Sequence, residues 1–349
     1  MQRRTTRTVT VGGVSIGSGH PIAVQSMLCA PPSDPAANIA QAVALKQAGC
    51  DILRLAIPTM EDIRLIPAIK KAVDLPLVAD IQFDYRLAVA AVEAGIDKIR
   101  INPGNIGGES NLRTVADACR ARHVPIRIGV NSGSLEKEVL ARYGRPTAEA
   151  LVESALANIR LLEKAHFEDY LVAIKSSDAV TTVEACRLFA GKTDCPLHLG
   201  VTEAGTERMG IIKSAAALGA LLCDGIGDTI RISLTADPVR EVEAAHDLLA
   251  ALGLEQNRIQ FVSCPTCGRC RVDLFRIAQE AEQALRDVPK KGKVAIMGCA
   301  VNGPGEAADA DLGIAGGDGE FLLFAKGKPL YKVSPEKATE SLLKEIEKL

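Results

Sequence analysis

The feature that most restricts the fold of this chain is a repeated alternation of short apolar runs with longer helix-like stretches. From Pro21 to about residue 250, the runs have the length of buried strands, and the stretches carry apolar residues at three- and four-residue spacing. The runs lie at 22–27, 51–56, 76–81, 97–102, 125–130, 169–175, 196–201 and 225–234. Alternating strands and helices form parallel βα units, and about eight such units predict a closed (β/α)8 barrel, an α/β fold.

The composition fits a buried parallel sheet covered by helices. Hydrophobic residues make up 47% of the 349 residues, but aromatic residues only 3%, so aliphatic side chains fill the interior. A net charge of -2 argues against a general nucleic-acid or membrane surface. No apolar run approaches the length of about 20 residues that spans a membrane. Ten cysteines without a secretory signal indicate reduced thiols or metal ligands, and we expect a cytoplasmic protein.

The pattern changes after about residue 252, which predicts a barrel domain over 1–252 and a small α+β domain over 253–349. The second domain is expected to contain strands at 258–262 and 294–297, a helix at 272–285, apolar runs at 320–325 and 329–333, and a helix from Ser334. Two additions to the barrel are also predicted. A Gly-Gly hairpin at 8–16 precedes it and is expected to close its bottom, and a short helix is expected within 134–147.

Five barrel strands carry a basic residue within an apolar run: Arg54, Arg100, Arg127, Lys175 and Arg231. A cation in such a run costs free energy unless it is paired or faces a cleft. Because barrel strands bring their carboxyl ends together at one face, we expect these side chains to converge there. Asp80, Glu203 and Asp228 could supply part of the opposing charge. An anionic phosphate ligand would supply the rest, and the alternative is a set of structural ion pairs.

Two weaker signals lie near the same face. The glycine-rich stretch N-P-G-N-I-G-G at 102–108 follows a strand and offers backbone N–H groups to a phosphate, although its residues are also ordinary turn formers. His198 is the histidine on a predicted strand near the barrel top. It is interpreted either as a substrate contact or as a packed core residue.

Cysteine spacing near the C-terminus predicts a metal site. Cys264, Cys267 and Cys270 form C-P-T-C-G-R-C, and Cys299 and Glu306 bound C-A-V-N-G-P-G-E. Soft thiolates favour zinc or an iron–sulfur cluster. Four cysteines and one carboxylate therefore compete for four positions, and the spacing leaves the ligand set open. A structural zinc site with four cysteines remains an alternative.

Several long stretches resemble one family, the bacterial 4-hydroxy-3-methylbut-2-enyl diphosphate synthases of the non-mevalonate isoprenoid pathway. They include A-D-I-Q-F-D-Y-R, R-I-N-P-G-N-I-G, H-L-G-V-T-E-A-G, S-C-P-T-C-G-R and G-C-A-V-N-G-P-G-E-A, and the resemblance covers nearly the whole chain. The resemblance implies a TIM barrel followed by a small α+β iron–sulfur domain. It also implies a homodimer in which the cluster domain of one subunit covers the barrel of the other.

The resemblance implies an oxidoreductase. Its reaction would open 2-C-methyl-D-erythritol 2,4-cyclodiphosphate reductively to 4-hydroxy-3-methylbut-2-enyl diphosphate. Two electrons would come from reduced flavodoxin or ferredoxin through a [4Fe-4S] cluster. In the family pattern, the cluster ligands correspond to Cys264, Cys267, Cys299 and Glu306. Cys270 is then a neighbour of the cluster. A carboxylate is a weaker iron ligand than a thiolate, so Glu306 can give way to a substrate oxygen and is counted as catalytic.

The family pattern also assigns residues in the barrel. The implied diphosphate and substrate contacts are Arg54, Arg100, Arg127, Lys175, Arg231 and Ser233. Asn131, Thr202 and Glu203 are expected to line the same site, with Glu203 transferring a proton to the departing oxygen. Gln82 stands where many relatives are expected to have His, so its role is left open.

The same residues are compatible with two other classes of protein. One is a barrel enzyme that acts on a diphosphate and carries a structural zinc, like a condensing enzyme of the pterin-synthase type. The other is a non-catalytic iron or redox sensor with exposed cysteines. Iron and sulfide content separates the first from the reductive enzyme, and turnover with a reductant separates the second.

Overall fold

The computed structural model describes residues 2–255, 257–286, 288–299 and 307–349 of the chain. It divides into two compact units, Met1–Leu248 and Leu249–Leu349, which are described separately. Among the described residues, no helix is both long and apolar enough to span a bilayer.

The first unit is built around eight parallel strands in the order β8-β7-β6-β5-β4-β3-β10-β9. These strands are β3 (Ala23–Met27), β4 (Ile52–Ala56), β5 (Leu77–Asp80), β6 (Lys98–Ile101), β7 (Ile126–Asn131), β8 (Tyr170–Lys175), β9 (His198–Leu199) and β10 (Thr229–Ile230). A parallel bridge between Val172 and Leu197 joins β8 to the segment before β9 and closes the ring. The structure confirms the predicted α/β barrel.

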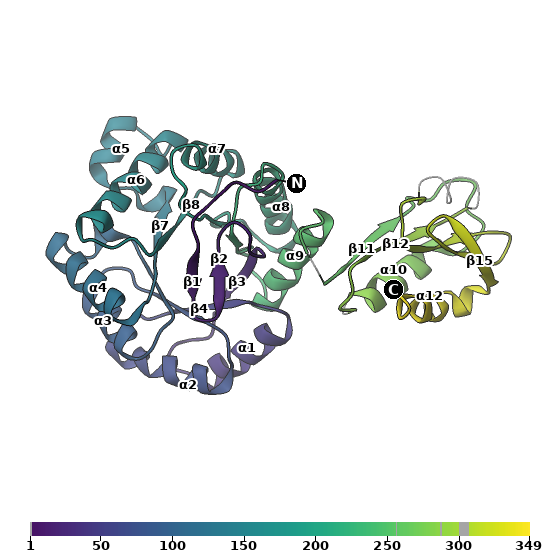
Figure 1. Cartoon of the computed structure of the whole chain (residues 1–349), viewed down its shortest axis with the longest axis horizontal. Coiled ribbons are helices and arrows are strands. Elements are labelled where there is room, and N and C mark those ends of the chain that lie inside the picture. Colours follow the sequence, from purple (N-terminus) through teal and green to yellow (C-terminus); the bar gives the residue numbers. More distant parts are fainter. Residues whose placement is uncertain (1, 256, 287, 300–306) are drawn as a thin grey trace. The chain divides into compact units, whose positions relative to one another are not determined.

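Helices follow the strands and surround them (Figure 1). The α-helices are α1 (Pro35–Gln47), α2 (Leu65–Ala72), α3 (Tyr85–Glu93), α4 (Glu109–Arg122), α5 (Lys137–Tyr143), α6 (Ala148–Lys164), α7 (Ala179–Ala190), α8 (Glu207–Cys223) and α9 (Pro238–Ala251). Short 3-10 turns are η1 (Met60–Arg64), η2 (Pro103–Asn105) and η3 (Ser132–Ser134). The predicted short helix within 134–147 is α5.

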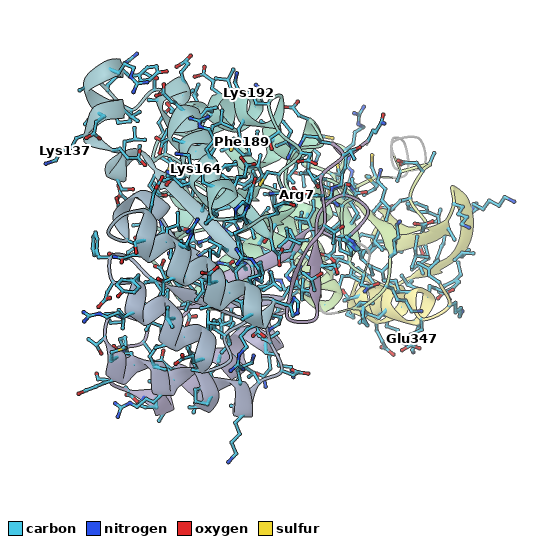
Figure 2. The ribbon with its side chains drawn as sticks, turned by 60° about the vertical axis from the view of Figure 1, so that its left-hand side comes forward. Arg7, Lys137, Lys164, Phe189, Lys192 and Glu347 are labelled. Carbon is cyan, nitrogen blue, oxygen red and sulfur yellow. The ribbon has the colours of Figure 1, made fainter. Side chains whose placement is uncertain are left out.

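Local sequence explains where several of these helices begin and how they pack. The side chains of Asp34, Thr147 and Asp178 each accept a backbone N–H in the first turn of a helix, which satisfies a donor that the helix itself cannot. Phe189 on α7, labelled in Figure 2, is fully buried. Its burial fixes one face of α7 against the barrel core.

The hairpin ahead of the barrel consists of β1 (Val9–Val11) and β2 (Val14–Ile16), joined at Gly12 and Gly13. Gly12 has a φ of +56°, which favours glycine. Three hairpin side chains share an apolar cluster with residues at the start of four barrel strands: Val9, Val11, Ile16, Ala23, Ile52, Val78 and Leu171. The hairpin therefore plugs the N-terminal end of the barrel, as predicted, and Figure 1 shows it across the middle of the strands.

Asp228 belongs to this closed end and not to the opposite face, so its predicted role there is wrong. It lies just before β10, where it forms an ion pair with Arg3 over 2.9 Å and accepts a hydrogen bond from Thr6. It also accepts the backbone N–H of Leu197 over 2.9 Å. The position of a residue relative to its strand decides at which end of the barrel it lies: Asp228 precedes β10, whereas Arg231 follows it.

The second unit has a five-stranded sheet in the order β11-β12-β13-β14-β15, parallel over the first three strands and antiparallel thereafter. Its elements are β11 (Ile259–Ser263), α10 (Leu274–Leu285), β12 (Gly292–Met297), β13 (Leu312–Gly316), β14 (Phe321–Ala325), β15 (Lys328–Val333), η4 (Pro335–Lys337) and α12 (Ala338–Ile346). One apolar cluster combines residues of α10, α12 and the sheet. This arrangement confirms the predicted α+β class.

Strand β13 was not predicted, because its sequence L-G-I-A-G is poor in the residues that favour strands. Packing explains this composition. A Cβ at Gly313 would lie 2.4 Å from the Phe324 ring and 2.6 Å from the Ala295 carbonyl oxygen. The close approach of its neighbours therefore requires glycine in the middle of the sheet.

The plug yields a stability prediction. Ile16 is completely buried in the hairpin cluster, so Ile16→Ala should lower the free energy of unfolding by about 2–5 kcal/mol, through lost burial and the cavity left behind. Val14→Ala is the matched control, because Val14 lies on the same strand and is only partly buried. Urea unfolding followed by circular dichroism measures both variants. Equal losses would contradict the plug role of Ile16.

Candidate functional site

The barrel interior changes from apolar to charged along its axis. At the plugged end, Ala23, Ile52, Val78 and Leu171 face the hairpin. Because alternate residues of a strand share a face, the residues two positions later also point inward. On three of these strands they are polar: Gln25, Arg54 and Asp80. Most barrels fill this space with Val, Ile and Leu, so the charged layer is a specific feature of this chain.

Asp80 holds two of the predicted cations. Its carboxylate accepts from Arg54 over 2.6 Å and from Arg100 over 3.0 Å. Burial alone would raise the pKa of Asp80, but the two guanidinium groups outweigh it and place this pKa below its ordinary value. Burial lowers the pKa of Arg54 to about 10, against the attraction of Asp80, so Arg54 remains protonated at neutral pH.

Arg231 is held by a carboxylate that sequence reasoning missed. Glu241 on α9 accepts from Nε and Nη2 of Arg231, both over 3.1 Å, in a bidentate pair. Glu241 is only 3% exposed and also accepts from Ser26 and from the backbone N–H of Leu234. The sequence gives no signal of this contact, because Glu241 lies in an ordinary amphipathic helix and nothing in that pattern links it to Arg231.

Arg127 and Lys175 have no carboxylate partner among the described residues. Arg127 is 2% exposed, and its Nε and Nη1 have no hydrogen-bond partner there. Lys175 Nζ lies 3.4 Å from His198 Nε2 and is 7% exposed. Burial, followed by the nearby Arg127, lowers the pKa of Lys175 and of His198 well below their ordinary values. Structural pairing thus accounts for three of the five predicted cations and leaves two uncompensated.

Lys98 adds a sixth basic side chain that the sequence interpretation did not single out. It is fully buried on β6, and its Nζ has no partner among the described residues. Burial, with repulsion from Arg127 and Arg54, lowers its pKa well below 10.5. The position could have been found from the alternation of K-I-R-I, because Lys98 and Arg100 share one face of the strand.

Two glycines give the cations room. A Cβ at Gly129 would lie 2.4 Å from Arg100 Nε, and one at Gly200 would lie 2.4 Å from Lys175 Nζ. Asn131 is partly buried at the end of β7. With its amide oriented toward Arg100, it accepts a hydrogen bond from Arg100 Nη2 over 3.1 Å. The structure therefore brings Asn131 into the cation cluster.

Other predicted site residues follow the last strands. Thr202 is partly buried, and its backbone N–H donates to the Ser176 carbonyl over 3.1 Å. Glu203 is exposed, has a φ of +51° and forms no ion pair with the described residues. Ser233 is partly buried two residues after Arg231. These residues lie at the carboxyl end of the barrel strands, the face where barrel active sites lie. Gln82 is also exposed.

In the predicted phosphate loop at 102–108, not every backbone N–H group is free to bind a phosphate. The backbone N–H of Gly104 already donates to Asn158 Oδ1 over 2.9 Å and to Asn102 Oδ1 over 3.2 Å. Gly107 and Gly108 have positive φ angles and precede α4. The loop is therefore a glycine-dependent turn in which the backbone N–H of Gly104 already has partners, and this geometry supplies no independent evidence for phosphate binding.

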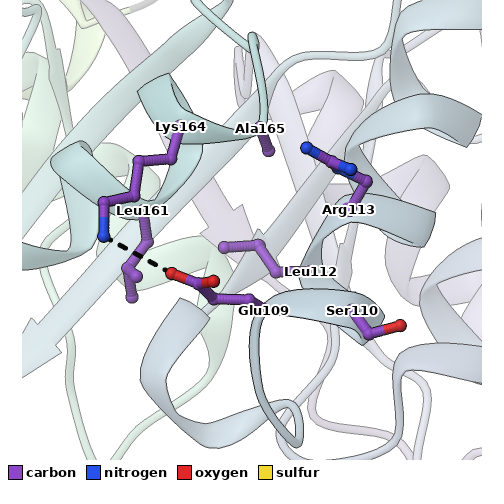
Figure 3. A pocket seen from close by; sticks show the side chains of 7 residues that line it. All are labelled: Glu109, Ser110, Leu112, Arg113, Leu161, Lys164 and Ala165. Atoms are coloured by element: carbon purple, nitrogen blue, oxygen red, sulfur yellow. Dashed lines mark hydrogen bonds and ion pairs between the residues drawn. The ribbon is translucent and has the colours of Figure 1, made fainter.

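A groove of about 290 Å³ lies on the outer helix ring between α4 and α6. Figure 3 shows its lining residues, including Glu109 and Lys164, whose charged groups are 3.5 Å apart. Both of these side chains are largely solvent-exposed, so the pair contributes little to stability. None of the predicted site residues lines this groove, and we do not assign the reaction to it.

The cysteines of the second unit lie at one edge of its sheet. Cys264 directly follows β11, and Cys299 lies two residues after β12. These strands are parallel neighbours with Ser263 opposite Ile296, so their carboxyl ends meet. Cys267 is exposed in the loop after Cys264, and hydrogen bonding from the backbone of Arg269 lowers its pKa. All ten cysteines are free thiols.

Glu306 lies outside the described residues, so its predicted role has no structural account. Ala307, the first described residue after it, is buried in an apolar cluster with Met297, and Cys264 packs against this cluster. Within the part of the chain that is described, no three His, Cys, Asp or Glu side chains form a metal-binding group. The soft thiolate donors themselves suit an iron–sulfur cluster.

Comparison with known protein families covers both units. Residues 6–246 match the GcpE TIM-barrel domain, and residues 260–348 match the GcpE protein C-terminal domain. The chain therefore belongs to the GcpE family, a class of two-domain barrel enzymes.

Individual relatives make the class more specific. The chain is 52% identical over 347 residues to the 4-hydroxy-3-methylbut-2-en-1-yl diphosphate synthase (flavodoxin) of Caldanaerobacter subterraneus subsp. tengcongensis, covering 99% of this chain and 98% of that protein. It is 52% identical over 349 residues to the enzyme of the same name from Geobacillus kaustophilus, covering 100% of this chain and 93% of that protein. These relatives confirm the predicted oxidoreductase, its activity and its place in isoprenoid biosynthesis, and they do not support the alternative enzyme with a structural zinc.

Solved structures resemble the barrel alone. A dihydropteroate synthase from Stenotrophomonas maltophilia has a TM-score of 0.53 and 16% identity, covering 72% of this chain and 100% of that chain. A truncated 3-deoxy-D-arabino-heptulosonate 7-phosphate synthase from Thermotoga maritima has a TM-score of 0.51 and 14% identity, covering 71% and 94%. At this identity the likeness shows the barrel fold and nothing about activity.

The unpaired Lys98 yields a prediction about pH. Because its pKa is lowered on folding, the folded protein binds fewer protons than the unfolded chain. The loss of folding stability that Lys98 causes is therefore largest at low pH and becomes smaller as the pH rises toward 10.5. Lys98→Met should be more stable than the wild type at pH 7, and the difference should narrow by up to about 1.4 kcal/mol per pH unit on the alkaline side.

Urea unfolding at a series of pH values measures this difference. Lys71→Met is the matched control, because Lys71 is exposed on α2 and should show no such narrowing. A Lys98→Met variant that is less stable than the wild type at pH 7 would show that Lys98 is charged and paired inside the barrel.

Proposed function

We propose that the barrel binds the diphosphate of 2-C-methyl-D-erythritol 2,4-cyclodiphosphate through its buried cations, and that this substrate is reductively opened to 4-hydroxy-3-methylbut-2-enyl diphosphate. The observation that carries the proposal is that the buried basic groups of Arg127 and Lys175 have no carboxylate partner among the described residues. Buried cations require a counter-charge, and guanidinium groups match phosphate oxygens in geometry. A diphosphate supplies several negative charges at once.

The proposed substrate-binding cations fall into two groups, those already paired with a carboxylate and those without one. Arg54, Arg100 and Arg231 are already oriented by carboxylates, so they present fixed donors and lose little side-chain entropy on binding. Arg127 and Lys175 keep free donors, so they are proposed to gain most from the ligand. The remaining proposed substrate contacts are Asn131, Thr202 and Ser233. Lys175 would take up a proton as the diphosphate approaches, because an anion raises the pKa of an adjacent amine.

In the second unit, Cys264, Cys267, Cys299 and Glu306 are the proposed ligands of a [4Fe-4S] cluster. The meeting of the β11 and β12 ends supports this set, because it places Cys264 and Cys299 at one sheet edge. When bound, such a cluster supplies electrons one at a time and a Lewis-acidic iron.

Glu203 is the proposed proton donor to the departing oxygen. Its exposed position after β9 and its left-handed backbone conformation support this role, because strained residues of this kind are frequent at active sites. The barrel domain is proposed to bind substrate over 1–252 and the α+β domain to hold the cluster over 253–349. We further propose a cytoplasmic homodimer that shares its site between subunits, takes electrons from flavodoxin or ferredoxin, and uses no nucleic acid or membrane partner.

The ligand set is tested by iron and sulfide analysis of anaerobically purified protein. Wild type should contain about four iron and four sulfide per chain. Cys267→Ser should lose both, because it removes a proposed ligand. Cys270→Ser is the matched control from the same loop and should keep both, together with activity. Zinc without sulfide in the wild type would contradict the cluster, and loss of iron in Cys270→Ser would contradict the choice of ligands.

Glu203→Gln tests the proton donor. The variant should keep its iron and sulfide but lose about 10²–10⁴-fold in turnover, the usual contribution of general acid catalysis. Steady-state assays with a chemical reductant and the cyclic diphosphate measure it. Thr206→Ala, at an exposed position close to Glu203 in the chain, is the control and should turn over normally. Near-normal turnover by Glu203→Gln would remove Glu203 from the mechanism.

A further inference from the structure

Cys270 is the one thiol of the C-P-T-C-G-R-C run that the proposed cluster does not use. Its backbone N–H donates to the Cys267 carbonyl over 3.0 Å, so residues 267–270 form a hydrogen-bonded β-turn. In such a turn the first and last Cα atoms lie within about 7 Å. Disulfides join Cα atoms about 4.4–6.8 Å apart, so the backbone already holds these two cysteines at a suitable spacing.

The two thiols have different surroundings. Cys267 is exposed, whereas Cys270 is partly buried and packs against the apolar cluster of the second unit. The Cys270 Sγ donates to the Val272 carbonyl over 3.3 Å. A Cβ at Gly298 would lie 3.0 Å from this Sγ, so the glycine leaves room for it. An oxidant from solvent therefore meets Cys267 first, while Cys270 is sheltered within reach.

Cys264 is a less suitable partner for Cys267. Its backbone N–H donates to the Ile296 carbonyl over 3.0 Å, which ties Cys264 to the edge of the sheet. Cys264 also packs against both apolar clusters of the second unit. The turn that begins at Cys267 leads away from this anchored position and toward Cys270.

We infer that Cys267 and Cys270 form a reversible disulfide when the cluster is absent, which makes the C-G-R-C turn an oxidative modification site. The inference rests on the proposed function in one respect: because Cys267 is a cluster ligand, it pairs with Cys270 only after the cluster is lost. In the loaded protein Cys270 remains a reduced neighbour.

The oxidant is a hydroperoxide, and the chemistry has two steps. The Cys267 thiolate attacks the O–O bond of hydrogen peroxide, takes up one oxygen as a sulfenic acid and releases hydroxide. The Cys270 sulfur then attacks the Cys267 sulfur. The S–O bond breaks, the S–S bond forms, and the oxygen leaves as water with the Cys270 proton. Two thiols and one peroxide thus give one disulfide and two waters. This stops Cys267 short of irreversible sulfinic acid, and a dithiol restores both thiols.

The sequence allows a direct test, because Arg269 separates the two cysteines. Full-length, anaerobically purified protein is analysed for iron and sulfide, treated with hydrogen peroxide, alkylated without reduction and digested with trypsin. Cleavage at Arg258, Arg269 and Arg271 leaves Cys267 in peptide 259–269 and Cys270 in peptide 270–271. Mass spectrometry should find these peptides joined, with fragmentation locating the bond at Cys267. A bond between Cys264 and Cys267, or no linked peptide, would overturn the inference.

Reloading of the oxidised protein provides a second readout. After peroxide, wild type and Cys223→Ser, a matched change at an exposed cysteine of the barrel, should regain their cluster absorbance with dithiol, iron and sulfide. Cys270→Ser should regain little and should carry sulfinic or sulfonic acid on Cys267. Equal recovery in all three proteins would contradict the protective role. Protein without iron and sulfide at the outset contradicts the proposed function, whereas loaded protein without the linked peptide contradicts only this inference.

Discussion

The positive charge enclosed by the barrel is the constraint on which the rest of the account depends. Six basic side chains face the interior, and among the described residues only Asp80 and Glu241 balance them there. Two like charges about 6 Å apart repel by roughly 3 kcal/mol at an effective dielectric constant of about 20. In the free protein this repulsion and burial together lower the pKa of Lys98, and a diphosphate would reduce the repulsion by adding negative charge.

The barrel could be predicted from the sequence because its signal is periodic and repeated. Each strand is an apolar run, and each cation breaks that run at a recognisable place, as in Arg100 and Arg231. The countercharges could not be assigned in this way. Glu241 reaches Arg231 from a helix that follows the strand, whereas Asp228 precedes the same strand and pairs at the plugged end. Only the three-dimensional ring decides which carboxylate meets which cation.

In the second unit, the candidate site could be predicted from the sequence more fully than the fold. Its cysteine spacing predicts a soft-metal site directly. Strand β13 has no clear sequence signal, because tight packing requires glycine in it. The sheet explains why cysteines far apart in the chain are usable together, since Cys264 and Cys299 follow neighbouring parallel strands. Spacing alone could not separate Cys270 from the ligands. In the structure, the hydrogen bond from its thiol to the Val272 carbonyl gives Cys270 a local partner of its own.

Proton uptake on substrate binding tests the central claim most directly. Calorimetric titration of the cyclic diphosphate into the protein, in buffers of different ionisation enthalpy between pH 7.5 and 9, reports protons exchanged per binding event. Because burial and the neighbouring Arg127 lower the pKa of Lys175 and a bound diphosphate would raise it again, the account predicts net uptake, reduced in Lys175→Met. Tight binding with no proton uptake at any pH in this range would show that the buried cations are fully charged before substrate arrives, and would contradict the account.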